Sequence, residues 1–215
     1  MSEGLDDGLE SPSLSERREL IAWALRLEWI TIGWMLIEAA VAIGSGIVAH
    51  SLTLIAFGAD SLIELASAGV LIRRLAIEIS RGEAVAAGFE RRAARIGSVL
   101  LFALAGYVVV AAGWSLWSRS GQEFSITGLV LALVAIPLMF GLARAKAHIA
   151  ERIGSRALRA DAAEAIACGY LSAVVVVGLI AQGLSGAWWI DGLSALALTP
   201  FLFREALEAW EDDAG

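Results

Sequence analysis

Six long, almost uninterrupted apolar stretches dominate this 215-residue chain. A helix needs about 20 mainly apolar residues to cross the hydrocarbon core of a bilayer. The stretches that approach or exceed that length are 27–49, 52–72, 96–117, 125–143, 161–184 and 188–203. With 58% hydrophobic residues, 18% charged residues and a mean hydropathy of +0.73, the composition is that of a membrane protein. The runs are continuous rather than alternating, which argues against a β-barrel. We therefore predict an all-α membrane protein, a six-transmembrane-helix bundle.

The positive charges predict how these helices are oriented. Lys and Arg are retained on the cytoplasmic side of a membrane, and every Lys and Arg except Arg119 falls on the side that holds both termini. Lys146 is counted here as part of the loop after the fourth span. We expect both termini to be cytoplasmic in a multi-pass protein of the cell membrane, with external turns near residues 50–51, 119–123 and 185–186.

The two ends of the chain differ in composition from the spans. Residues 1–26 are predicted to be a cytoplasmic N-terminal tail, disordered or interfacial in its first 25 or so residues. Residues 27–208 form the predicted six-helix transmembrane domain, and 209–215 a short cytoplasmic tail. The formal net charge of -7 comes largely from acids in these tails, and we interpret it as solvation rather than as a cation-collecting surface.

Two pairs of polar residues interrupt the apolar spans at a spacing of four. Asp60 and Glu64 lie in the second span, and Glu164 and Cys168 lie in the fifth. Residues four apart share one face of a helix, and ionisable groups at membrane depth usually belong to an ion or substrate pathway. Counted from the cytoplasmic boundary, Glu64 and Cys168 reach similar depths. Three carboxylates and one thiol suit a four-coordinate site for a divalent transition metal. The structural alternative is a set of buried carboxyls bonded to hydroxyls such as Ser61, with Cys168 as core filler.

Three further acids are possible accessory or proton-coupling groups. Glu38 lies near the centre of the first span, where a proton carrier, a transient ligand and a packing contact are all open interpretations. Asp161 lies one turn before Glu164 and is interpreted as a supporting group or a group at the mouth of the path. Asp191 opens the sixth span beside Trp188 and Trp189, where an acid at a helix start is ordinary.

Several classes of function have no matching pattern in the sequence. The single cysteine excludes an internal disulfide. We find no phosphate-binding glycine loop, no nucleophile with an activating base and no reason to expect a nucleic-acid partner. We therefore expect no enzyme activity and no prosthetic group.

Three segments resemble one known family. Residues 59–64, Ala-Asp-Ser-Leu-Ile-Glu, resemble the second-helix signature of the cation diffusion facilitators. Residues 155–168, containing Ala-Asp-Ala-Ala-Glu and then Cys, resemble that family's fifth-helix pattern of Ala-Asp-x-x-His-x-x-x-Asp. Residues 189–196 are similar to the start of its sixth helix. Together these segments span essentially the whole membrane region.

The resemblance implies a function and a ligand set. Asp60, Glu64, Glu164 and Cys168 stand at the family's metal-binding positions, and the transported ion would be zinc, cobalt, cadmium, iron or manganese. Glu164 replaces the His of zinc-selective members, and Glu64 and Cys168 replace Asp. The acid favours harder ions whereas the thiol favours softer ones, so zinc selectivity is not implied. Only a short segment follows the sixth span, so we expect the transmembrane domain without the family's C-terminal cytoplasmic domain.

The expected function is export of a divalent cation in exchange for protons, by alternating access. The expected partners are the metal ion, protons, the lipid bilayer and a second copy of the chain. The coupling protons are expected on Glu64, Glu164 or Cys168, because metal ions bind the deprotonated forms of such groups. The alternative is a membrane-embedded metal-binding or assembly subunit that does not itself transport.

Overall fold

The structure is a computed structural model. It describes the backbone of residues 14–81, 83–119 and 123–214, and side-chain surroundings for 15–73, 98–119, 123–155, 158–207 and 210. Within these residues the chain forms six helices and no strand, which confirms the predicted fold class. They are α1 (Leu14–Ala49), α2 (Leu52–Arg81), α3 (Glu83–Ser118), α4 (Ile126–Ile153), α5 (Arg156–Ser185) and α6 (Ile190–Ala214).

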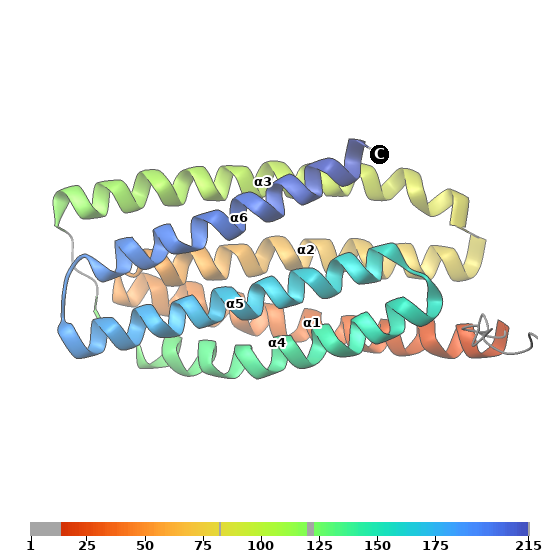
Figure 1. Ribbon diagram of the computed structural model, residues 1–215, viewed down its shortest axis with the longest axis horizontal. Coiled ribbons are helices and arrows are strands. Elements are labelled where there is room, and N and C mark those ends of the chain that lie inside the picture. The colour runs from red at the N-terminus through yellow and green to blue at the C-terminus, as the bar shows by residue number, and fades with distance from the viewer. Residues whose placement is uncertain (1–13, 82, 120–122, 215) are drawn as a thin grey trace, which may run out of the picture.

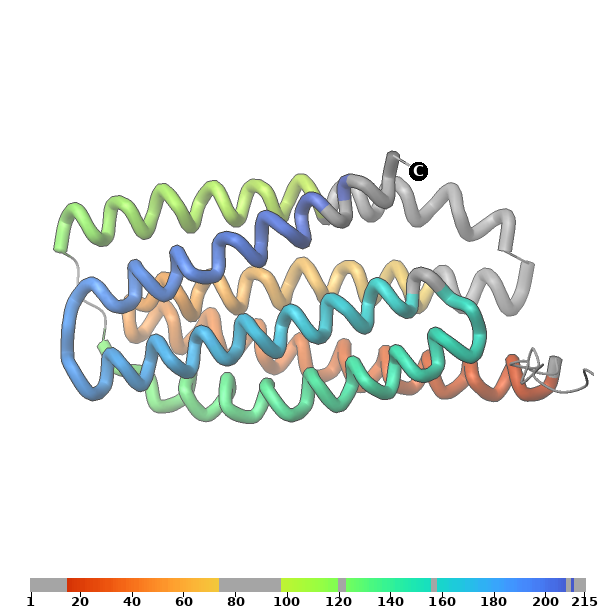
Figure 2. The backbone as a smooth tube through the Cα atoms, in the orientation of Figure 1, coloured from red at the N-terminus to blue at the C-terminus, as the bar shows by residue number. Residues whose placement is uncertain are grey.

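The helices lie side by side along one long axis (Figure 1). Each helix packs most extensively on one partner, in the pairs α1 with α2, α3 with α6 and α4 with α5. Further contacts join α1 to α4 and join α2 to α3, α5 and α6. The predicted adjacency of the second and fifth helices is therefore confirmed. We call the two ends of the bundle the His50 end, where α1 meets α2 and α5 meets α6, and the Gly154 end, where α4 meets α5 (Figure 2).

Local sequence signals set several helix ends. Ser125 and Ser155 begin α4 and α5 by accepting bonds from the backbone N–H groups of Gly128 and Leu158. Such caps satisfy N–H groups that have no partner inside the helix. Gly154 and Gly186 end these two helices with φ of 68° and 62°, a left-handed conformation that glycine adopts without strain.

All six helices extend beyond the predicted spans at the Gly154 end. α1 begins at Leu14, so residues 14–25 are helical and the expectation of disorder is wrong there. Ile21 and Ala24 of this added segment are buried in a small cluster with Ile149 and Ile153 of α4. The Arg17 Nη1 atom also donates to the Ile153 carbonyl at 3.0 Å. Packing and hydrogen bonding against α4 therefore stabilise the helical conformation of residues 14–25, which lie before the span that hydropathy predicts.

The sixth helix differs from the others in polarity. Five of the helices are long and apolar enough to cross a membrane, in the segments Ser15–Ala49, Leu52–Arg73, Ser98–Ser118, Ile126–Ile153 and Leu158–Ser185. α6 is absent from that group among the described residues, because Asp191, Arg204 and Glu205 all fall within residues 190–207. It nevertheless packs as the sixth member of the bundle and continues to Ala214, through most of the predicted tail.

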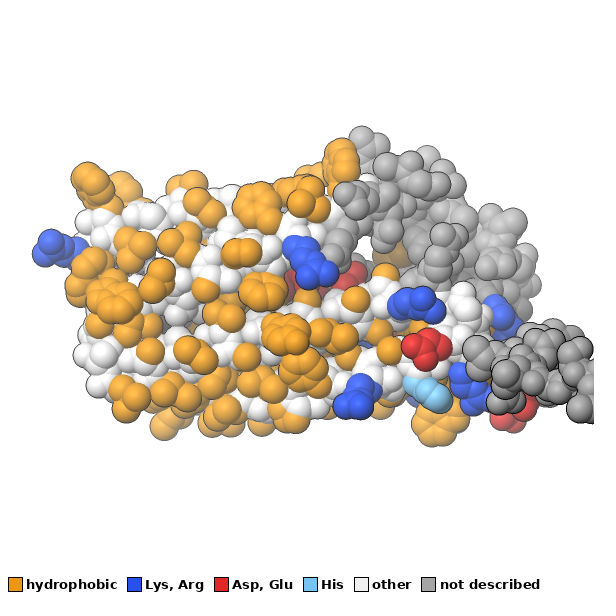
Figure 3. Space-filling model, viewed as in Figure 1, with side chains coloured by type: hydrophobic (Ala, Val, Ile, Leu, Met, Phe, Trp, Pro, Cys, Tyr) orange, Lys and Arg blue, Asp and Glu red, His pale blue; other side chains and the backbone are white. Residues whose placement is uncertain are grey.

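Apolar side chains both fill the bundle and cover its outside. Phe57, Met139 and Leu171 are buried in the main core cluster, whereas Val110 and Leu184 are 73% and 85% exposed. Figure 3 shows apolar side chains spread over one face and most charged ones gathered toward the Gly154 end. Apolar side chains on the outside of a helical bundle are suited to contact with the hydrocarbon core of a bilayer. The chain is a multi-pass membrane protein, and which end is cytoplasmic stays a prediction.

Glycine allows close approach of α1 and α2 at two positions. A Cβ atom on Gly46 would lie 2.8 Å from Ile55 Cγ1, and one on Gly58 would lie 2.8 Å from Ile43 Cγ1. Small residues in the spans, Gly44, Gly46 and Gly69 among them, are predicted from the sequence to permit close helix approach, and Gly46 does so. The same prediction is wrong for Gly44 and Gly69, because no described atom outside their own helix backbone lies within 4 Å of a Cβ built there.

Candidate metal site

Acidic and thiol side chains from three helices meet in the interior of the bundle. Asp60 and Glu64 of α2 are 2% and 8% exposed, Cys168 of α5 is fully buried, and so is Glu38 of α1. Glu164 of α5 is half-buried. The spacing of four keeps the two α2 acids on one face, and likewise the α5 pair.

Glu38 connects α1 to both other helices. Its Oε2 atom accepts a bond from Trp34 Nε1 at 2.7 Å. Its Oε1 atom accepts from Ser61 Oγ at 2.7 Å and from Cys168 Sγ at 3.5 Å. Of the interpretations open for this residue, the contacts favour a packing and positioning role.

Asp60 and Glu64 are in the opposite situation. No described donor bonds to Asp60 Oδ1 or to either carboxylate oxygen of Glu64, although these atoms are buried. Ser61, which the structural alternative paired with such acids, donates to Glu38 instead. Buried polar atoms are nearly always hydrogen-bonded, and an exception needs an explanation such as an ion that binds there. The donor set on α2 therefore fits a cation.

Cys168 lies among these acids rather than among apolar groups alone. It is close enough to Glu64, Glu38 and Asp60 to interact with each electrostatically. The predicted meeting of the two pairs at similar depth is thus supported for Glu64 and Cys168.

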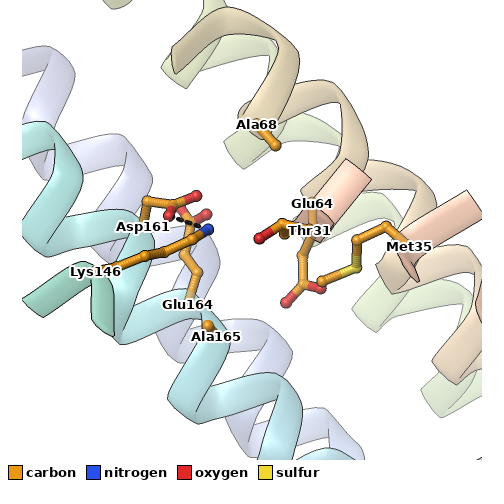
Figure 4. Close-up of a pocket in the computed structure, with 8 residues that line it drawn as sticks. All are labelled: Thr31, Met35, Glu64, Ala68, Lys146, Asp161, Glu164 and Ala165. Carbon is orange, nitrogen blue, oxygen red and sulfur yellow. Dashed lines mark hydrogen bonds and ion pairs between the residues drawn. The ribbon is translucent and has the colours of Figure 1, made fainter. Parts of the chain in front are cut away.

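Glu164 lies on the side of the site nearer the Gly154 end. Together with Glu64 it lines a small cavity of about 10 Å³ between α1, α2, α4 and α5. That volume is close to the least that holds one water molecule. In Figure 4 the Glu64 and Glu164 side chains lie on opposite sides of this space. The rest of its lining consists of Thr31, Met35, Ala68, Ala165 and two charged residues, Lys146 and Asp161.

Lys146 and Asp161 belong to a buried ion triad, whose third member is Glu28. Lys146 Nζ lies 3.2 Å from Glu28 Oε1 and 3.2 Å from Glu28 Oε2, and it also donates to Asp161 Oδ2. Lys146 and Glu28 are fully buried. The assignment of Lys146 to the loop after the fourth span is therefore wrong: α4 continues to Ile153, and the triad joins α1, α4 and α5.

Sequence reasoning missed Glu28 and the role of Lys146, although two signals were present. Four residues of α1 follow one another at helical intervals on one face: Glu28, Thr31, Met35 and Glu38. Glu28 belongs to the triad, Thr31 and Met35 line the cavity, and Glu38 bonds with Cys168. Lys146 is the only lysine in a chain whose other basic residues, histidines aside, are all arginine.

The remaining candidates lie at different heights in the bundle. Asp161 is buried, pairs with Lys146 and lines the cavity, beside the proposed ligands. Asp191 lies at the His50 end, where Ser51 Oγ and the backbone N–H groups of Leu52 and Thr53 donate to its carboxylate at 2.7–3.1 Å. It therefore caps α2 from α6, and an accessory role in transport stays a prediction.

The side chains do not form a closed metal cage in this conformation. Within the part of the chain that the structure describes, no three His, Cys, Asp or Glu side chains converge into a group that could hold a metal ion. Asp60, Glu64, Glu164 and Cys168 are nevertheless linked as electrostatic neighbours, since Glu164 interacts with Asp60 and Cys168 with Glu64. Their joint coordination of one ion stays a prediction.

Fold and interior together define a class: a helical multi-pass membrane protein with several buried acids in the interior of its bundle. The family model described as the cation efflux transmembrane domain matches residues 29–212. The chain belongs to the cation efflux family, as the motifs in residues 59–64, 155–168 and 189–196 indicated. It is a metal cation efflux transporter rather than an enzyme. A comparison with curated proteins gave no match.

Proposed function

We propose that the chain exports a divalent transition-metal ion in exchange for protons, with Asp60, Glu64, Glu164 and Cys168 as the ligands. The observation that most supports this is Glu64, a buried acid in a membrane helix with neither oxygen bonded to a described donor. It lines the same cavity as Glu164. An ion bound between α2 and α5 would compensate Glu64, whose oxygens no described donor reaches.

The proposed ligands limit the choice of metal. Carboxylate oxygens suit manganese and ferrous iron, and a thiolate suits zinc, cobalt and cadmium. Three carboxylates and one sulfur therefore favour borderline ions over magnesium or calcium, which prefer oxygen alone. Titration of several divalent ions into wild type and Cys168→Ser ranks them: a thiol-dependent preference for zinc, cobalt or cadmium identifies Cys168 as a ligand.

Proton exchange would follow from the same groups. A metal ion binds deprotonated carboxylates and thiolate and displaces their protons. Glu64, Glu164 and Cys168 would then bind protons on one side of the membrane and metal on the other. The helix contacts suit alternating access, because α2 and α5 each pack more extensively on another helix than on each other. The seam between them is where the site would open. A homodimer, expected from the resemblance, belongs to the same proposal.

Flux measurements in proteoliposomes test this function. We expect the purified chain to move Cd²⁺ into vesicles down its gradient and to move protons in the opposite direction, read by an entrapped pH dye. The variant with Glu64→Gln, Glu164→Gln and Cys168→Ser should lose both fluxes. Metal binding without flux in wild type would instead identify a binding or assembly subunit. Proton-coupled flux that survives the triple replacement would contradict the assigned ligands.

A further inference from the structure

A buried ammonium group, that of Lys146, lies beside the proposed metal site and is not one of its ligands. Lys146 is fully buried, and its Nζ atom lies between Glu28 of α1 and Asp161 of α5. Lysine is strongly hydrated and costly to bury, and buried lysines need compensating acids. Within a membrane helix such a residue usually has a function.

Position relates this group to the transported ion. Lys146 and Asp161 line the same small cavity as Glu64 and Glu164. In Figure 4 the nitrogen of Lys146 points into the space toward Glu64 and Thr31, and Asp161 and Glu164 lie on its own side. Glu164 interacts electrostatically with Lys146 as well as with Asp161. A cation that reaches Glu64 and Glu164 therefore comes close to the ammonium.

We infer that Lys146 is a tethered cation that competes with the transported metal ion for the acids of the cavity, and so weakens metal binding and speeds metal release. This inference rests on the proposed function. Like charges repel strongly where little water screens them, so the ammonium opposes a divalent ion bound at Glu64 and Glu164. When the metal leaves, the same ammonium partly neutralises the acids that remain. An exporter needs such a limit on affinity, because an ion held too tightly does not leave.

The inference predicts a gain of affinity, which a purely structural role does not. Replacing Lys146 with the neutral and polar Gln removes the repulsion, and we expect the dissociation constant for Cd²⁺ to fall by about tenfold or more. In proteoliposomes, KM and the maximal rate of Cd²⁺ flux should fall together. Lys146→Arg keeps the charge and should bind Cd²⁺ within about threefold of wild type. A residue that only holds helices together would give weaker binding when replaced.

Calorimetric titration of Cd²⁺ into wild type, Lys146→Gln, Lys146→Arg and Glu64→Gln tests this directly. Tighter binding by Lys146→Gln alone supports the inference, and equal or weaker binding by the folded variant overturns it. Glu64→Gln separates the two proposals: undiminished affinity in this variant contradicts the metal site itself. A wild-type chain that binds no Cd²⁺ overturns both proposals.

A second measurement needs no variant of Lys146. Because the chain has one lysine, protein grown with lysine labelled with nitrogen-15 at Nζ gives a single side-chain NMR signal. We expect that signal to shift as Cd²⁺ saturates the wild-type protein. A signal that does not change at saturation places the metal away from Lys146 and overturns the inference, even if Lys146→Gln fails to fold.

Discussion

Glu64 shows how a single residue can serve function at the expense of stability. It is 8% exposed, and none of the described donors bonds to its two oxygens. Glu38, one helix away, is also a buried glutamate, but it accepts bonds from Trp34, Ser61 and Cys168. We therefore expect replacement by Gln to affect stability differently at the two positions.

Replacing Glu64 with Gln should lower Cd²⁺ affinity by about 100-fold while leaving thermal stability unchanged or raising it by about 1 kcal/mol. The amide replaces a metal ligand, and it also removes a buried carboxyl group that no described donor stabilises. Glu38→Gln is the matched control and should lower the free energy of unfolding by about 1–3 kcal/mol, because it disturbs the bonds from Trp34, Ser61 and Cys168. Melting curves in detergent with and without Cd²⁺ measure both effects. Equal destabilisation by the two variants would contradict this assignment of roles.

At the scale of helices, Asp191 fixes the start of α2 from another helix. Its carboxylate accepts bonds from Ser51 Oγ and from two backbone N–H groups of α2, and Thr53 Oγ1 donates to its backbone carbonyl at 2.9 Å. Asp60 lies nine residues further along α2, about 13 Å from Ser51 at the usual rise per residue. Asp191 thus positions the helix that holds two proposed ligands without approaching the ion.

Asp191→Ala should therefore reduce stability by about 2–3 kcal/mol through loss of the cap. Cd²⁺ affinity of the folded protein should stay within about twofold of wild type. Unfolding curves and calorimetric titration of one sample check both statements. Weaker Cd²⁺ binding at unchanged stability would place Asp191 in the transport path after all.

The close packing of α1 on α2 makes a second prediction at this scale. Gly46→Ala puts a methyl group 2.8 Å from Ile55 Cγ1 and 2.9 Å from its backbone N, and should destabilise by about 1–3 kcal/mol. Gly44→Ala is the control two residues away. It meets no described atom outside its own helix backbone within 4 Å and should stabilise the helix by up to about 1 kcal/mol. Similar melting temperatures for the two variants would contradict the close contact between α1 and α2 at Gly46.

Part of this site follows from sequence, and the rest depends on contacts between distant segments. Asp60 with Glu64, and Glu164 with Cys168, are recognisable because a spacing of four in an apolar run predicts one helix face. The pairing of Lys146 with Glu28 joins residues 118 positions apart, and no local spacing indicates it. Hydropathy also ends the predicted fourth span at residue 143. A hydropathy value treats Lys146 as a solvated charge, and it contains no information on the acids of α1 and α5 that pair with it. The bond from Ser51 to Asp191 spans 140 positions and was missed for the same reason.

At the scale of the whole molecule, the bundle brings acids of α1, α2 and α5 close together in its interior, while many apolar side chains face outward. Charged side chains gather toward the Gly154 end (Figure 3), which the distribution of arginine predicts to be cytoplasmic. The triad of Lys146, Glu28 and Asp161 then lies on the cytoplasmic side of the proposed metal site. Metal leaving the cytoplasm would meet the triad before the ligands.

Reporter fusions test that orientation. A fluorescent protein fused after Gly215 should fold and fluoresce, because the C-terminus is predicted to be cytoplasmic. Alkaline phosphatase inserted after Gly186, in the turn between α5 and α6 at the His50 end, should be active because it is predicted to be external. The reverse pattern would invert the predicted direction of transport.

The most direct test of the whole account is X-ray absorption spectroscopy of the Zn²⁺-loaded protein. Ligands from α2 and α5 predict one sulfur at about 2.3 Å and oxygens at about 2.0–2.2 Å. In Cys168→Ser the sulfur should disappear and the oxygens remain. A wild-type spectrum without sulfur, or one unchanged by combined Asp60→Asn and Glu64→Gln replacement, would contradict the proposal that α2 and α5 share one ion.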